Sequence, residues 1–390
     1  MKDFPRDEKS YFNSRLMSLC VFLLSFLNRV FTVLGLGLPQ SGRNHGSASH
    51  GGGRLDGREN MGQAKKVLAD LAIGKSRAID PADEDLHSPN REDLNWAETS
   101  WWAFANADGD IGGWFYLLTR RNLGVASLGI YIWDGTSANP WDFPYSKHFQ
   151  HIPLAADFSL LNGSFPEIGA ALGVREPLRS YWLRYSDTPH LEFELDFEAL
   201  VMPQPIGVGE STGHLDQLLW AKGELRFEGR QVRIDGPACR DRTWSTRPEA
   251  NAGQYNSYAW GATRNGGFHA MMLETPEGQL LFSAGFIWRD GAVVPIEKVK
   301  RTVEARGPDG HAIRVRMEMT DREGRVVNLV GSSRSTAALE AFTGSLCWCS
   351  VMDWQAEDGP IYRGEDHEGW PHTLLRQARL TGKLPGLGEL

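Results

Sequence analysis

Short stretches in which polar and apolar residues alternate, separated by tight-turn pairs, are the feature that most constrains the fold of this chain. In residues 191–197, Leu and Phe occupy every second position and acidic residues occupy the positions between them. Successive side chains of a strand point to opposite faces of a sheet, so this pattern predicts one core face and one solvent face. Related stretches occur at residues 114–118, 126–133, 223–229 and 313–319. The turn pairs between such stretches are Asp108-Gly109, Asp134-Gly135, Asn162-Gly163, Asn265-Gly266, Asp290-Gly291 and Asp309-Gly310.

The predicted fold class is therefore all-β, built from antiparallel meanders. Sheets this extensive must close or stack to hide their edges, and 390 residues exceed one typical core. We predict two antiparallel β-barrels or sandwiches packed together, the first over residues 93–215 and the second over residues 216–375, followed by a tail at 376–390. No glycine-rich phosphate loop and no alternation of strands with helices occurs, which disfavours a nucleotide-binding α/β fold.

The N-terminal part of the chain is predicted to be a helical or disordered extension. Residues 1–60 hold an apolar run, interrupted by Asn28-Arg29, and a linker rich in Gly and Ser. The first apolar run is short for a membrane span of about 20 residues. Three interpretations stay open: an upstream extension or disordered leader, a membrane-associated segment, and a signal peptide. Residues 61–92 are predicted to form a helix and a connecting segment.

Composition points to a small, hydrophobic partner. The chain has 14 Trp, 18 Phe and 9 Tyr, and such aromatic residues favour pleated sheets and line apolar pockets. A net charge of -8 without a long basic stripe argues against nucleic acid as the main partner. We expect no cofactor, and a cytoplasmic location with membrane association through the N-terminal apolar run as an alternative.

The cysteines and acidic runs give no metal-site spacing, so no metal is predicted. The four cysteines form no C-x-x-C pair. Cys347 and Cys349 are two residues apart, so in a strand both point to one face, as small buried residues or, alternatively, as redox or metal-binding groups. The acidic stretch of residues 365–368 is predicted to be a solvated loop.

The densest group of directional polar side chains lies at residues 240–244. In a strand, Arg240, Arg242 and Trp244 share one face, and Asp241 and Thr243 share the other. A guanidinium beside an indole can present its donors in a fixed fork to a substrate oxygen or to a carboxylate. The segment is therefore either the wall of a site or a structural network that joins two sheets.

Further candidates come from two aromatic segments. His269 alternates with apolar residues, as a satisfied core histidine or an acid/base group would. Tyr258 and Trp260 share a face of the preceding strand and can line a cavity. Glu98 lies in an aromatic block with Trp102, where exclusion of water would raise its pKa; the alternative is an ordinary strand edge.

These residues also carry a family resemblance, which covers roughly residues 80–375. The chain resembles the tandem lipocalin-like (calycin) proteins grouped with carotenoid hydratase (hydroxyneurosporene synthase) and AttH, and especially their bacterial relatives that open with an Asn-Trp-x-Glu-Ser/Thr block. The segments that carry it are Asn95–Phe104, His214-Leu215-Asp216-Gln217, Lys222-Gly223-Glu224-Leu225, Asp235-Gly236 and Arg240-Asp241-Arg242-Thr243-Trp244.

The resemblance implies two calycin-like barrels with an apolar cleft near their junction. It also implies a cofactor-independent hydratase, dehydratase or cyclase acting on a hydrophobic terpenoid, steroid or polyketide-like substrate. The family's His-Asp-His-x-Trp motif maps onto residues 240–244, where arginines replace both histidines. Because arginine stays protonated, protonation of an alkene would need another acid, such as Asp241, His269 or Glu98.

Roles for the remaining residues follow from that assignment. Arg240 and Arg242 are expected to orient a substrate oxygen, and the substrate-binding wall is expected to comprise Trp244, Tyr258, Trp260 and Trp102. A non-catalytic carrier of hydrophobic small molecules is the alternative, since such barrels bind ligands without an acid.

Overall fold

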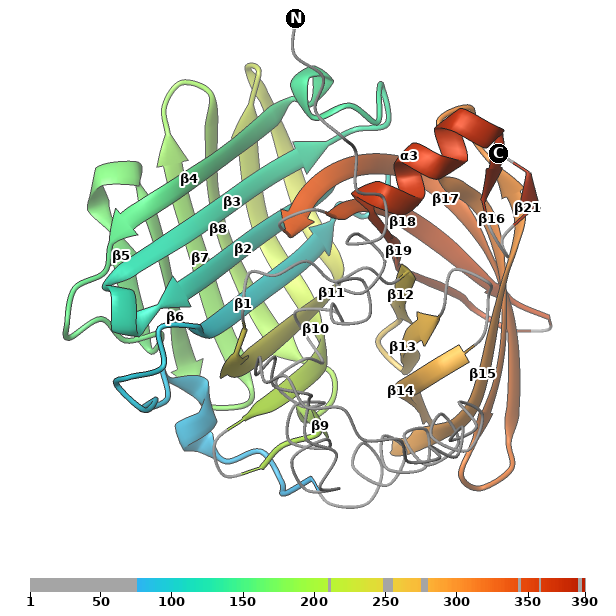
Figure 1. Cartoon of the computed structure of the whole chain (residues 1–390), viewed down its shortest axis with the longest axis horizontal. Helices are drawn as coiled ribbons and strands as arrows, with labels where there is room; N and C mark the ends of the chain where they lie inside the picture. The colour runs from blue at the N-terminus through green and yellow to red at the C-terminus, as the bar shows by residue number, and fades with distance from the viewer. Residues whose placement is uncertain are drawn as a thin grey trace, which may run out of the picture.

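The structure, a computed structural model, describes residues 76–209, 212–247, 255–274, 280–342, 345–357, 359–384 and 388–389. Antiparallel strands form two units that lie side by side (Figure 1), which confirms the predicted all-β class. The apolar run lies outside the described residues, and so does the part of the predicted 61–92 helix and connecting segment before residue 76; residues 76–92 contain the short 3-10 helix of residues 81–84. Among the described residues, no helix has the length and apolar character needed to cross a bilayer.

The first unit is an open, curled sheet of 11 strands in the order β4-β3-β2-β1-β11-β10-β8-β7-β6-β5, with β9 paired to β10. Its strands are β1 (Trp96–Ala105), β2 (Gly112–Arg120), β3 (Val125–Trp133), β4 (Tyr145–Pro153), β5 (Asn162–Phe165), β6 (Ala170–Glu176), β7 (Ser180–Asp187), β8 (Leu191–Ala199), β9 (Gln204–Ile206), β10 (Gly213–Phe227) and β11 (Arg230–Thr246). The 3-10 helices are η1 (Pro81–Glu84), η2 (Arg121–Leu123), η3 (Pro140–Asp142) and η4 (Pro166–Ile168).

Residues 191–197 lie in strand β8, and their side chains alternate between buried and at least partly exposed as predicted. Leu191, Phe193, Leu195 and Phe197 are buried, whereas Glu194 and Asp196 are exposed. The buried side chains join the core on the concave side of the curled sheet. One-sided burial of this kind fixes the register, because a slip by one residue would turn every apolar side chain to water.

The second unit is a closed barrel of eight strands, β12 to β19, drawn in gold to red in Figure 1. Its strands are β12 (Tyr255–Ala262), β13 (Gly266–Glu274), β14 (Leu280–Arg289), β15 (Ala292–Arg306), β16 (Ala312–Asp321), β17 (Val326–Phe342), β18 (Ser345–Ala356) and β19 (Ile361–Pro371). Helix α3 (His372–Thr381) follows and packs Leu374 and Ala378 against Trp348 and Trp370. The short strands β20 (Lys383–Leu384) and β21 (Gly388–Glu389) pair with each other.

The strand pairing places the change from sheet to barrel after Thr246. β10 pairs along its length with β11, and β11 pairs with β1, so all three belong to the first sheet. The division predicted between residues 215 and 216 therefore falls inside β10. The first strand of the barrel begins at Tyr255.

The outer face of the barrel packs directly on the convex face of the first sheet. Trp101, Trp114 and Cys239 of the sheet share one buried cluster with Trp260 and Phe286 of the barrel. The barrel interior is a separate core that contains Phe268, Met317 and Trp354. The layer between the units is thus a second, aromatic core, and it contains the polar groups described below.

Close packing in this layer gives a stability prediction. A Cβ added at Gly112 would lie 2.4 Å from the Trp133 ring and 2.7 Å from Val351 across the junction. We expect Gly112→Ala to lower the free energy of unfolding by about 1–3 kcal/mol, because the Trp133 ring and the Val351 side chain are both tightly packed and cannot move away from the new methyl group. Urea denaturation measures this, with Gly209→Ala as control, where the nearest atom to the new Cβ is 3.8 Å away. Equal stability of the two variants would contradict the packing described.

Candidate functional site

Strand β11 divides the predicted site residues between two faces. Arg240, Arg242 and Trp244 point to the concave interior of the first sheet, and Asp241 points to the barrel. Trp102 is the cross-strand partner of Arg240 and joins the same concave core. The alternation predicted for residues 240–244 is confirmed. It also means that Asp241 and Trp244 do not face a common space.

Every nitrogen of the Arg240 guanidinium donates to a protein group. Its two terminal nitrogens donate to the Glu84 carboxylate at 2.8 and 2.7 Å, and Nε donates to Gln217 at 2.7 Å. One terminal nitrogen also donates to the Tyr181 hydroxyl at 2.7 Å. Burial alone would raise the pKa of Glu84, but the charge and hydrogen bonds of Arg240 hold it below its usual value. The pair is buried and ionised.

Arg242 binds the chain segment that precedes β1. It donates to the carbonyl oxygens of Asp83 and Asp85 and lies 3.2 Å from the Glu98 carboxylate. Glu98 in turn accepts from the backbone N–H of His87 at 2.9 Å, and the His87 ring stacks on Trp244 with centroids 4.2 Å apart. These contacts hold the segment of residues 83–87 against the concave face of the sheet.

A different set of polar side chains meets where β10 and β11 face the barrel. We define the junction cluster as His214, Asp216, Asp241, Tyr258 and His269. Asp216 and Asp241 are direct cross-strand partners, so both carboxyl groups project from the same face. His214 lies 2.9 Å from Asp216, and the Tyr258 hydroxyl donates to Asp216 at 2.7 Å. The cluster thus joins strands from both units.

The two carboxyl groups of the junction cluster titrate differently. Burial would raise the pKa of Asp216, but the nearby His214 and the hydrogen bonds from His214 and the Tyr258 hydroxyl lower it overall. For Asp241, burial dominates, and with the nearby charge of Asp216 it raises the pKa to about 7. One carboxyl oxygen of Asp241 is buried without a hydrogen bond among the described residues. Near neutrality, Asp216 is therefore a carboxylate and Asp241 can carry a proton.

His269 completes the cluster as a neutral imidazole. Its side chain is fully buried, and burial lowers its pKa to about 4. One ring nitrogen lies 3.4 Å from Asp216, but neither nitrogen makes a hydrogen bond within the described part of the chain. A buried imidazole that lacks hydrogen bonds can accept a proton from a bound molecule or a water.

Aromatic rings enclose the junction cluster. The Trp101 ring lies edge-on to Tyr258 with centroids 5.6 Å apart, and Phe286 stacks on His269 at 5.6 Å. Tyr258 and Asp241 keep part of their surface exposed although their strand neighbours are largely buried. The junction cluster therefore borders solvent at these two side chains.

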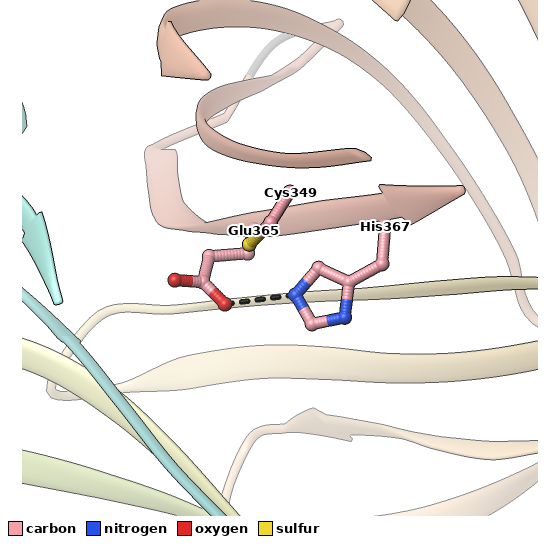
Figure 2. Close-up of side chains that lie close together, drawn as sticks. All are labelled: Cys349, Glu365 and His367. Carbon is pink, nitrogen blue, oxygen red and sulfur yellow. Dashed lines mark hydrogen bonds and ion pairs between the residues drawn. The ribbon is translucent and has the colours of Figure 1, made fainter. Parts of the chain in front are cut away.

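A second buried polar group lies on the barrel side of the same layer. Figure 2 shows Cys349 of β18 with Glu365 and His367 of β19, which we call the β18–β19 triad. Glu365 accepts from the Trp114 indole at 3.2 and 3.1 Å and lies 2.8 Å from the His367 ring. The His367 ring stacks on Tyr258 with centroids 5.1 Å apart. The triad is thereby in contact with the junction cluster.

The loop predicted at residues 365–368 is wrong, because these residues form the buried middle of β19. Glu365 and His367 face the first sheet, whereas Asp366 and Glu368 bind Arg301 on the barrel side. Four consecutive polar residues give no hydrophobic alternation, so the sequence carried no signal for a buried strand. The burial predicted for Cys347 and Cys349 is confirmed.

The predicted site residues therefore separate into two groups. Asp241, His269, Tyr258 and Trp260 come together in the layer between the units. Arg240, Arg242, Trp244, Trp102 and Glu98 lie on the concave side of the first sheet. Sequence reasoning gave little weight to Asp216 and none to Trp101, which complete the first group.

Comparison with known proteins assigns the family and supports the fold. A model of a domain of unknown function, DUF7064, matches residues 80–361. The chain belongs to the DUF7064 family. No curated protein sequence matches this chain.

Several solved structures are similar to this DUF7064 protein although they share little sequence with it. A protein of Nitrosomonas europaea assigned as an AttH is 13% identical, with 76% of this chain and 97% of that chain covered at a TM-score of 0.53. CghA is 13% identical, with 77% and 97% covered at a TM-score of 0.52. Kievitone hydratase from Nectria haematococca is 12% identical, with 77% and 95% covered at a TM-score of 0.48. The predicted resemblance to the tandem lipocalin-like proteins is confirmed for the fold.

Proposed function

We propose that this protein is a hydratase, dehydratase or cyclase that acts on a hydrophobic terpenoid, steroid or polyketide-like molecule by proton transfer at the junction cluster. The observation that carries the proposal is the unequal pair of cross-strand carboxyl groups, Asp216 and Asp241, within an aromatic layer. Near neutrality Asp241 can keep its proton while the neighbouring Asp216 is ionised. General acid–base catalysis needs such a pair of one protonated and one ionised group.

In hydration, the proton of Asp241 would form a new C–H bond with one alkene carbon, using the electron pair of the double bond. The neighbouring carbon becomes a cation, and the ring faces of Tyr258, Trp101 and Trp260 would stabilise it by about 0.5–2 kcal/mol each. Water then forms the C–O bond, and the proton it releases returns to the Asp241 carboxylate. Dehydration follows the same steps in reverse.

Cyclisation would use the same first step. A second double bond of the substrate would then attack the cation in place of water, and loss of a proton to Asp241 or His269 would end the reaction. His269 suits the role of base because it is neutral and makes no hydrogen bond among the described residues. The resemblance to carotenoid hydratase supports this reaction class, and no cofactor is required for the proton transfer.

The test begins by extracting any hydrophobic molecule that copurifies with the full chain. After extraction, the ligand is incubated with the protein in ¹⁸O-labelled water and analysed by mass spectrometry. We expect a product that gains or loses one water, with ¹⁸O incorporated on hydration, or an isomer of unchanged mass and altered retention. Tight binding with no chemical change would instead identify a carrier of hydrophobic molecules and overturn the enzyme proposal.

A further inference from the structure

We infer that the β18–β19 triad, Cys349, Glu365 and His367, is a binding site for a divalent transition-metal ion of the zinc class. This site is separate from the acid–base pair of the proposed function and does not depend on it. Figure 2 shows the three side chains converging from two neighbouring strands. All three are buried, and one potential ligand atom from each lies within 4.8 Å of the other two.

The ligand chemistry selects the class of metal. A thiolate, an imidazole and a carboxylate are the groups that bind Zn²⁺ in proteins, at about 2.0–2.3 Å. The hard cations Mg²⁺ and Ca²⁺ prefer oxygen ligands alone. Three protein ligands leave a fourth tetrahedral position for water or for an oxygen of a bound molecule, which is the open coordination of catalytic zinc sites.

The strands hold the three ligands in place before any metal binds. Cys349 and His367 are direct cross-strand partners, and Glu365 lies two residues from His367 on the same face of β19. Both strands belong to the closed barrel, so neither can shift its register without disturbing the whole barrel. A site on paired strands is more precisely arranged than one on loops.

Outer-shell contacts fix the orientation of two ligands. The Trp114 indole donates to both oxygens of Glu365, and the Trp260 indole lies 3.4 Å from one of them. The His367 ring is held by stacking on Tyr258 and by the edge of Trp101 at 5.4 Å. Partners of this kind orient metal ligands and typically change affinity by about 10- to 100-fold when removed.

The Glu365–His367 pair needs only a small rearrangement to bind a metal. Glu365 and His367 are 2.8 Å apart, a hydrogen-bond distance, whereas two ligands of a tetrahedral ion at about 2.0 Å are separated by about 3.3 Å. The ion would therefore replace the hydrogen between them as the carboxylate moves by about half an ångström, and the neutral His367 imidazole would carry its proton on Nδ1 instead. Binding would release the Cys349 thiol proton to solvent, and the thiolate and carboxylate would then neutralise the divalent charge, so the occupied site carries no net charge.

One other described cluster brings three potential ligand atoms equally close, namely His214, Asp216 and Asp241. It contains no thiolate, and it includes the two carboxyl groups of the proposed acid–base pair. A spectroscopic probe of thiolate coordination therefore distinguishes the two locations.

Cobalt titration of the metal-free full chain is the direct test. Co²⁺ substitutes for Zn²⁺, and a Cys–Co²⁺ bond gives a near-ultraviolet charge-transfer band. We expect one Co²⁺ per chain with this band, displaced by an equivalent of Zn²⁺. Binding without the band, or no saturable binding, would overturn the inference.

Variants locate the ion. Cys349→Ser is expected to abolish the charge-transfer band and to weaken Co²⁺ binding by more than about tenfold. The matched control is Cys347→Ser, two residues away on the same strand and also buried, which should retain the band. Asp241→Asn should retain it as well. If Cys347→Ser loses the band and Cys349→Ser keeps it, the site is not the one inferred here.

Discussion

Asp241→Asn is expected to reduce turnover of the ligand by about 10²- to 10⁴-fold, the range over which general acids contribute to catalysis. Asparagine keeps the shape of the side chain but has no acidic proton. The neighbouring Asp216 cannot replace it, because its contacts with His214 and Tyr258 keep it ionised. The rate is measured on the extracted ligand, and the cooperative unfolding transition confirms that the variant is folded.

The matched control for this variant is Asp235→Asn on the same strand. Asp235 accepts from the Trp220 indole and from Arg233 at the solvent-exposed part of β11. We expect its replacement to leave turnover within about twofold of the wild type, as for surface sites away from the reaction. If Asp235→Asn and Asp241→Asn retain the same activity, Asp241 is not the acid.

The same carboxyl group predicts the pH dependence of the reaction. Because Asp241 donates a proton and its pKa is raised to about 7, kcat/KM should be constant in mild acid and fall as pH rises through 7. The limiting decrease is about tenfold per pH unit. A pH–rate profile of the wild type measures this, and a profile that rises through the same range would contradict the role of Asp241 as acid.

The raised pKa of Asp241 also predicts that Asp241→Asn, although less active, is more stable than the wild type at neutral pH. The Asp241 carboxyl group has a pKa of about 7 in the folded protein and the usual 3.8 when unfolded. Its ionisation therefore lowers the stability of the wild type progressively as pH rises from about 4 to about 7. Asp241→Asn removes this penalty. Its melting temperature, relative to the wild type, should therefore increase from pH 4 to pH 7 and stay constant above it.

The second large effect is expected at the buried pair of Glu84 and Arg240. Glu84→Gln would leave the Arg240 guanidinium buried with only neutral acceptors, Gln217 and Tyr181. Removing one partner of a buried ion pair typically costs about 3–5 kcal/mol, because the remaining charge has no compensation. Urea denaturation should show this loss as a lower midpoint for the unfolding of the first sheet.

An exposed pair on the same sheet provides the control. Arg184 and Glu194 also form an ion pair, but both side chains are more than half exposed to solvent. Glu194→Gln should change stability by only about 0–1 kcal/mol. If Glu84→Gln were as stable as Glu194→Gln but weakened ligand binding, Arg240 would be a substrate-binding residue, as the sequence predicted.

The different outcomes for β8 and β19 show what the sequence could predict. Apolar residues at every second position identified β8 and its buried face. In residues 365–368, burial depends on partners from other strands, such as Arg301 and Trp114, which no local pattern reveals. Local alternation therefore predicted the fold class but not the buried polar strand.

The candidate site shows the same division. The alternation in residues 240–244 correctly separated Asp241 from its arginine neighbours. It could not reveal that Arg240 binds Glu84, a residue 156 positions away in the sequence. Nor could it reveal that Asp216 lies opposite Asp241, because that contact depends on the register between β10 and β11.

The protonation of Asp241 itself is the most direct test of the proposed chemistry. Infrared difference spectra of the wild type and Asp241→Asn, recorded as a function of pH, isolate the C=O stretch of this carboxylic acid. We expect a protonated band that disappears with a midpoint of about 7. A midpoint at the usual value near 4 would mean that Asp241 carries no proton under working conditions, and the assignment of the acid would be wrong.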